Sequence, residues 1–148
     1  MIKVKIANTQ EKVTLDFARL RETATRVLDG ERIAEAKVTL AFVDNPTIHR
    51  LNKQFLQHDE PTDVLSFPLS GAGARVLEGE VVIGVEVAES QALERGHDLH
   101  AETALYAIHG LLHLCGYDDD TPKNRKAMRE RERHYLAVMQ LPDIAELT

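Results

Sequence analysis

One apolar stripe constrains the fold of this 148-residue chain more than any other feature. Between residues 101 and 115, apolar side chains recur at the three- and four-residue spacing of a single helix face. They are Ala101, Ala104, Leu105, Ile108, Leu111, Leu112 and Cys115. Gly116 follows at once, where a residue in the left-handed conformation commonly ends a helix. The stripe predicts a long helix packed against the core, around which the other elements must be arranged.

Strand-like and helix-like segments interleave along the rest of the chain. Alternating or β-branched residues predict strands at 2–7, 36–43, 62–69 and 79–88, with a loop or hairpin tip at 70–79. Helical spacing predicts helices from about residue 14 to Gly30, from Pro46 with Asn45 as its cap, over 90–96, and over about 122–140. Pro68 indicates a strand at a sheet edge, because proline has no N–H to donate. This order predicts a single α/β (α+β) domain over residues 1–148.

Charge and cysteine content limit the classes of function. The chain has 24 acidic and 18 basic side chains and a formal net charge of −6, which disfavours nucleic-acid binding unless basic residues gather locally. Cys115 is the single cysteine, so an intramolecular disulfide is excluded. The first residues lack an apolar signal-peptide core, and no stretch approaches the roughly 20 apolar residues of a membrane span. We therefore expect a cytoplasmic protein that does not associate with membranes.

Two histidines lie at the edge of the apolar stripe. His109 and His113 are four residues apart, so they project from one helix face one turn apart and could share a metal ion. Half-buried histidines satisfied by hydrogen bonds would show the same spacing. Gly110 stands where zinc proteases of the HExxH type have their catalytic glutamate, which argues against a protease. A glycine there also lets a substrate or another part of the backbone come close.

Three consecutive acids follow the helix end. After Gly116 the chain passes through Tyr117 into Asp118, Asp119 and Asp120. A chain that reverses after His113 can bring a third ligand back over the two imidazoles. A solvated acidic turn that caps the next helix at Thr121 would also explain the three acids.

With these residues in view, the chain resembles the YbeY family of rRNA maturation endoribonucleases. Residues 109–119, HGLLHLCGYDD, resemble the family signature H-G-x-L-H-L-x-G-Y-D-H, and residues 51–68, LNKQFLQHDEPTDVLSFP, resemble a second family block. The segment 79–88, GEVVIGVEVA, matches a third. The resemblance implies an α/β fold with a small mixed sheet of about four strands and a metal site at the C-terminal end of the long helix. His109 and His113 then carry over as ligands, and the family's third histidine falls on Asp119.

The resemblance also implies a function. It implies a metal-dependent, single-strand-specific endoribonuclease that acts in 16S rRNA 3′-end maturation and ribosome quality control. The implied cofactor is one Zn²⁺ per chain, with Mn²⁺ or Ni²⁺ as alternatives. The implied partners are single-stranded or ribosomal RNA and ribosomal small-subunit proteins, and the implied oligomeric state is a monomer. The alternative is a ribosome-binding or protein-binding relative that keeps the metal for structure and has weak or lost nuclease activity.

Two departures from the family pattern shape the site hypothesis. Asp119 replaces a histidine; aspartate is an established zinc ligand, although Asp118 or Asp120 could serve instead. Leu56 replaces a family arginine, and His58 and Arg75 are candidate catalytic substitutes. No general base is identified from the sequence.

Several other polar residues have two readings. Glu102 could orient a ligand histidine, although an exposed acid near the start of the helix is the simpler expectation, and Cys115 is expected in the core. The remaining histidines, His49, His58, His97, His100 and His134, are expected at the surface. A basic cluster could follow RNA phosphates or form a salt-bridged helix face with Glu130 and Glu132. It comprises Lys123, Arg125, Lys126, Arg129, Arg131 and Arg133.

Overall fold

A computed structural model describes residues 1–56, 63–71 and 73–145. Within these residues four strands form one sheet in the order β1-β2-β4-β3. They are β1 (Ile2–Asn8), β2 (Ala36–Val43), β3 (Val64–Pro68) and β4 (Leu77–Gly84). β1 and β4 both run parallel to β2, whereas β3 is antiparallel to β4. The predicted mixed sheet is confirmed, and Pro68 ends an edge strand as expected.

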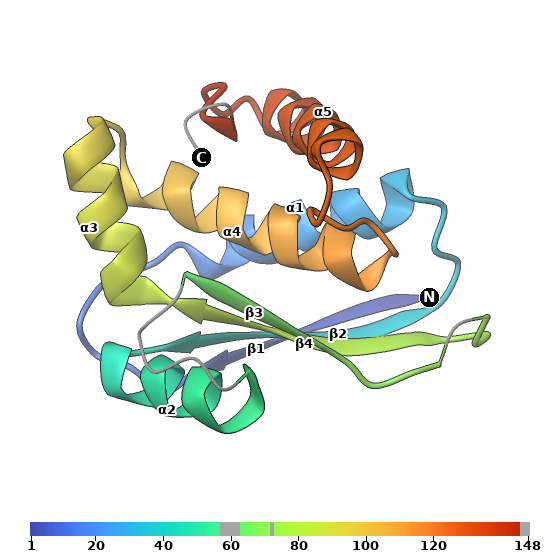
Figure 1. Cartoon of the computed structure of the whole chain (residues 1–148), viewed down its shortest axis with the longest axis horizontal. Helices are drawn as coiled ribbons and strands as arrows, with labels where there is room; N and C mark the ends of the chain where they lie inside the picture. Colours follow the sequence, from blue (N-terminus) through green and yellow to red (C-terminus); the bar gives the residue numbers. More distant parts are fainter. Residues whose placement is uncertain (57–62, 72, 146–148) are drawn as a thin grey trace.

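Helices cover the two faces of the sheet unequally (Figure 1). They are α1 (Phe17–Gly30), α2 (Asn45–Leu56), α3 (Val85–Arg95), α4 (Leu99–Leu114) and α5 (Pro122–Val138). α4 lies between the sheet and α5, with α1 beside it, while α2 packs against the opposite face. No helix among the described residues is long and apolar enough to cross a membrane.

α4 is buried on more sides than its stripe predicts. Thr103, Tyr106 and Ala107 lie outside the stripe and are nevertheless buried, because α1, α3, α5 and the sheet all contact this helix. His109 and His113 near its C-terminal end stay partly exposed. Gly116 has a φ of 105°, the left-handed conformation expected after the helix. The central helix therefore places His109 and His113 at the surface, just before the turn at Gly116.

The strand predicted at 79–88 is wrong in its second half. β4 ends at Gly84, and Val85 begins α3. Val85, Ala88 and Ala92 form the buried face of that helix at helical spacing. A short apolar run is compatible with either a buried strand or a buried helix, so the sequence did not mark the boundary.

Two expected helix boundaries also differ in detail. Asp44, rather than Asn45, accepts the N–H of Thr47 at 3.0 Å and so caps α2. Gly30 is the last residue of α1 and does not adopt a left-handed conformation. It is needed for packing instead, because a Cβ at this position would overlap the ring of Tyr135 on α5.

Gly110 allows α4 to approach the sheet closely. A Cβ at this position would lie 2.5 Å from Val81 Cγ1 and 3.2 Å from Ser66 Oγ. The Ser66 hydroxyl donates to the Gly110 carbonyl oxygen at 3.0 Å. Side chains of the sheet therefore occupy the space that the missing side chain of Gly110 leaves.

We expect Gly110→Ala to lower the free energy of unfolding by about 1–3 kcal/mol, because the added methyl group must push Val81 or the helix aside. Urea denaturation measures this change. Gly71→Ala is the matched control, since a Cβ at Gly71 meets no atom within 4 Å. Equal midpoints for the two variants would contradict the packing argument.

Candidate metal centre

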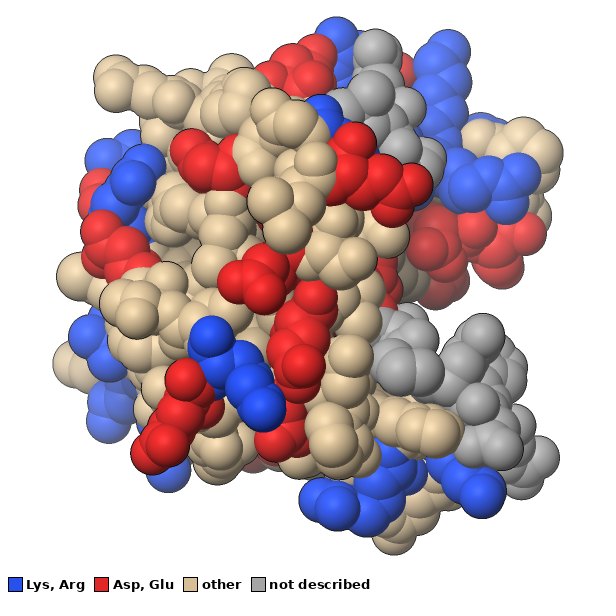
Figure 2. All heavy atoms as spheres, turned by 90° about the vertical axis from the view of Figure 1, so that its left-hand side faces the viewer, with Lys and Arg blue, Asp and Glu red and all other residues tan. Residues whose placement is uncertain are grey.

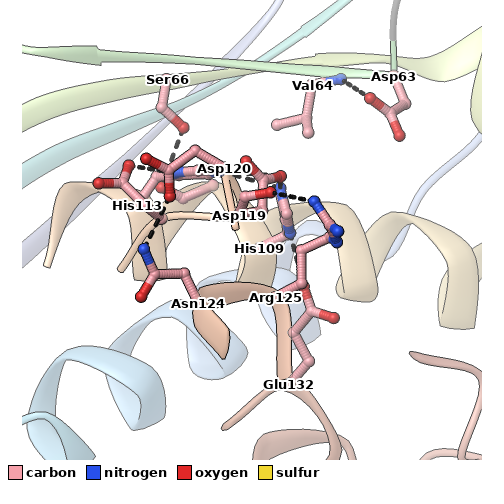
Figure 3. Close-up of polar contacts among 12 residues, drawn as sticks. Asp63, Val64, Ser66, His109, His113, Asp119, Asp120, Asn124, Arg125 and Glu132 are labelled. Atoms are coloured by element: carbon pink, nitrogen blue, oxygen red, sulfur yellow. Dashed lines mark hydrogen bonds and ion pairs between the residues drawn. The ribbon is translucent and has the colours of Figure 1, made fainter. Parts of the chain in front are cut away.

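The three sequence-predicted ligands come from two segments that the helix end brings together. His109 and His113 lie on the last two turns of α4. After Gly116 the chain folds back, and the Tyr117 N–H donates to the Leu112 carbonyl oxygen at 3.0 Å. This reversal places Asp119 beside both imidazoles (Figure 3).

The donor atoms of these residues converge on one point. The Nε2 atoms of His109 and His113 are 3.1 Å apart, and Asp119 Oδ2 lies 3.6 Å from the first and 3.7 Å from the second. A tetrahedral zinc ion with bonds of about 2.0 Å requires donor atoms about 3.3 Å apart. Two imidazoles and a carboxylate at this spacing could therefore hold such an ion.

The neighbouring acids are placed differently. Asp118 Oδ1 is 3.9 Å from Nδ1 of His113, which is not the nitrogen that faces His109. Asp120 accepts a hydrogen bond from the Asn124 side chain at 2.8 Å, and Thr121 caps α5. Among the three acids, Asp119 is the one that groups with both histidines in the described chain. Asp120 fits the capping-turn interpretation, because it contacts the first turn of α5.

Glu132 on α5 orients His109, a role that the sequence analysis missed. Its fully buried carboxylate accepts a hydrogen bond from His109 Nδ1 at 2.6 Å, because a carboxylate has no proton to give. Nε2 of His109 therefore keeps its lone pair for a metal. The sequence did carry a sign that Glu132 is buried, because it lies on the same helix face as three apolar residues at helical spacing. They are Met128, Tyr135 and Leu136.

Glu102 has a structural role instead. The expectation of an exposed acid is wrong, because its side chain is fully buried and contacts His97 Nε2 and, at 3.5 Å, Arg95 Nη1. The surface expectation for His97 is wrong for the same reason: only 10% of its side chain is exposed. These contacts join α3 to the start of α4 and leave the orientation of His109 to Glu132.

Of the two candidate catalytic residues, Arg75 belongs to the described part of the chain. His58 lies outside the described residues. Arg75 donates to Glu35 at 3.2 Å, and its side chain is 87% exposed. It lines neither of the two cavities beside His109. A catalytic role for either residue stays a prediction.

Two cavities open onto the candidate metal centre. One of about 170 Å³ is lined by residues that include His109, Asp119 and Arg129. The other, of about 610 Å³, runs along β3 and is lined by residues that include both histidines and Asp119. The three donors thus leave one side of the centre accessible, as catalytic metal sites do.

Tyr106 lines the smaller cavity but cannot act there as a base. Burial, followed by the negative charges of Glu102 and Asp63, raises the pKa of its phenol well above the ordinary value. The hydroxyl therefore keeps its proton at neutral pH and can serve as a hydrogen-bond donor.

Cys115 packs against the core, as expected, and burial raises the pKa of its thiol to about 11. It should therefore stay protonated at neutral pH and react slowly with iodoacetamide. We expect its alkylation rate to rise with pH along a titration with an apparent pKa of about 11. Glutathione alkylated in parallel should titrate near the usual thiol value of about 8.5. An apparent pKa for Cys115 at or below that of glutathione would contradict its burial.

Three of the six residues in the basic cluster of α5 form salt bridges. Arg131 pairs with Glu31 at 2.5 Å, Arg133 with Asp143 at 2.8 Å and Arg129 with Glu132 at 2.7 Å. These pairs favour the solvated-face interpretation over a continuous phosphate track. The face at the α3 end of the molecule is acidic: Figure 2 shows Asp and Glu side chains along the middle of this face. A polyanion would not approach there.

Comparisons with known proteins point to one family. The family profile described as Endoribonuclease YbeY matches residues 5–140. The Endoribonuclease YbeY of Pelotomaculum thermopropionicum is 44% identical over 148 residues, covering 93% of this chain and 97% of that protein. The protein of the same name from Salinibacter ruber is 40% identical, covering 86% and 87% respectively. The solution structure of TM1509 from Thermotoga maritima matches with a TM-score of 0.68 at 31% identity, covering 94% of this chain and 89% of that one.

Proposed function

The chain belongs to the family of the endoribonuclease YbeY, and from this premise we propose that it is a metal-dependent endoribonuclease that cuts single-stranded RNA. The observation that carries the proposal is the convergence of His109, His113 and Asp119 beside two open cavities. Metal-dependent cleavage of a phosphodiester needs such a centre, because the donors must leave room for the substrate.

We propose His109, His113 and Asp119 as the metal ligands and one Zn²⁺ per chain as the ion, with Mn²⁺ or Ni²⁺ as alternatives. When bound, the ion supplies Lewis acidity that polarises a phosphoryl oxygen and acidifies water. Glu132 fixes the ring of His109 so that Nε2 faces the centre. Asp119 adds a negative charge, which suits harder ions such as Mn²⁺ better than a third imidazole would.

A purely structural metal is the less supported alternative. Structural zinc sites are usually closed by four protein ligands. The group found among the described residues has three members and opens onto cavities on one side. This arrangement favours an enzyme over a ribosome-binding relative that has lost nuclease activity.

Family membership extends the proposal to a cellular role. We propose that the chain acts in 16S rRNA 3′-end maturation and ribosome quality control, as a monomer in the cytoplasm. Ribosomal RNA and ribosomal small-subunit proteins are the proposed partners. We propose that residues 1–148 form a single domain that carries the three ligands.

The test compares RNA cleavage before and after metal removal. We expect zinc-loaded protein to cut a labelled single strand and to leave the same sequence intact as a duplex. Chelation followed by gel filtration should stop cleavage, and added Zn²⁺, Mn²⁺ or Ni²⁺ should restore it. Cleavage that survives complete chelation would contradict the proposal, as would a metal-loaded protein that cuts neither substrate.

A further inference from the structure

The smaller cavity beside His109 is strongly acidic for a site that must admit a phosphodiester. Asp63, Asp119 and Glu132 place three carboxylates around it. Figure 3 shows Asp63 on the β3 side and Glu132 on the α5 side, with His109 and Asp119 between them. Even a divalent ion at the centre leaves one negative charge uncompensated. An RNA phosphate would be repelled unless a cation lies in the same cavity.

Arg129 is the single Lys or Arg among the described residues that line this cavity. Its Nη1 donates to both Glu132 oxygens, at 2.7 Å and 3.1 Å. No described residue accepts a hydrogen bond from its Nη2 or Nε. A guanidinium group carries five N–H donors in a planar fork, so those two nitrogens keep donors for a second anion.

The geometry around Arg129 suits a phosphate contact for two further reasons. Its side chain is 26% exposed, so it is accessible and also partly shielded from solvent. Its pairing with buried Glu132 restricts the guanidinium beside His109. Arg125, one turn earlier on α5, donates instead to the Asp119 carbonyl oxygen at 3.2 Å and lines neither cavity.

We propose that Arg129 binds a backbone phosphate of the RNA strand in the cavity beside the metal centre, through the donors that Glu132 leaves unused. This inference rests on the proposed function and assigns a substrate contact within it. Arg129 would thereby cancel the excess negative charge of the cavity and make it able to accept an anionic strand.

The test is the salt dependence of strand binding. Metal-loaded wild-type protein, Arg129→Gln, Arg129→Met, Arg129→Lys and Arg133→Gln are titrated with a short single-stranded 2′-O-methyl RNA, which is checked for integrity afterwards. Each phosphate contact that is lost should lower the slope of log affinity against log salt by about 0.7. Arg133→Gln is the matched control, because it removes the same charge from α5 and lines neither cavity.

We expect Arg129→Gln and Arg129→Met to bind about tenfold more weakly at low salt and to show the shallower slope. Arg129→Lys and Arg133→Gln should keep the wild-type slope. Zn²⁺ affinity should stay near wild type in all four variants, and this readout separates a phosphate contact from a positioning role through Glu132. The melting temperature should fall in Arg129→Gln and Arg129→Met, because the buried Glu132 carboxylate loses its cation, so binding is measured well below the melting transition.

Three results would overturn the proposal: an unchanged slope in Arg129→Gln, equal slope changes in Arg129→Gln and Arg133→Gln, or a loss of Zn²⁺ affinity that accounts for the weaker strand binding. The outcome is distinguishable from failure of the proposed function. A protein that binds the strand through Arg129 and cuts no RNA would contradict the nuclease alone. A protein that cuts RNA with an unchanged slope in Arg129→Gln would contradict the arginine contact alone.

Discussion

The His113→Ala variant is expected to lose its bound metal ion and its cleavage of RNA together. His113 Nε2 lies 3.1 Å from His109 Nε2 and 3.7 Å from Asp119 Oδ2, so its removal leaves two donors on one side of the proposed ion. Two ligands hold zinc far more weakly than three, and we expect less than about a tenth of an equivalent to remain after gel filtration. Metal analysis and cleavage of a labelled single strand measure the two losses.

His134→Ala is the control for this variant. His134 is an exposed histidine on α5 whose ring contacts Tyr135, and it contributes no donor to the candidate centre. It should retain one metal ion per chain and wild-type cleavage. His113→Ala protein that still cuts RNA as fast as wild type would show that the activity comes from a contaminant. Asp119→Ala extends the comparison, since unchanged Zn²⁺ affinity in that variant would move the third ligand elsewhere.

The fold was predictable where one element carries its own periodicity and its own stop signal. The stripe from Ala101 to Cys115 predicted α4, and Gly116 predicted its end, because both signals are local. The boundary between β4 and α3 was not predictable. The run from Val81 to Ala88 is apolar except for Glu86, and the helical conformation after Gly84 is favoured by the tertiary contacts that bury Val85 and Ala88.

The candidate site likewise has a part that the local sequence predicts and a part that depends on tertiary contacts. His109, His113 and Asp119 lie within eleven consecutive residues, and the turn at Gly116 brings them together locally. Glu132 and Arg129 belong to another helix, and nothing in the local sequence says that α5 crosses α4 at His109. From the sequence, both residues were expected on a solvated, salt-bridged helix face, with a basic cluster that follows RNA phosphates as the alternative for Arg129. The stripe of α5 that contains Met128 and Leu136 could have marked Glu132 as buried, although it could not have named its partner.

The Glu132→Gln variant tests that tertiary contact. The carboxylate of Glu132 accepts a hydrogen bond from His109 Nδ1 at 2.6 Å and balances the charge of Arg129. Glutamine has nearly the same shape and can still accept one hydrogen bond, but it has no negative charge to raise the basicity of His109. Loss of a carboxylate partner behind a ligand histidine typically lowers metal affinity about 10- to 100-fold. Competition with a coloured zinc chelator measures the change.

Glu130→Gln is the matched control, because it makes the same chemical change two residues away. Glu130 is exposed on α5 and lines neither cavity beside His109, so this variant should keep the wild-type Zn²⁺ affinity. Equal affinities in Glu130→Gln and Glu132→Gln would mean that His109 holds its orientation without the carboxylate. A melting temperature that falls in Glu132→Gln while Zn²⁺ affinity stays constant would assign Glu132 to the packing of α4 against α5 instead. A drop in affinity confined to Glu132→Gln would show that α5, remote from the sequence motif of the site, sets the strength of the metal centre.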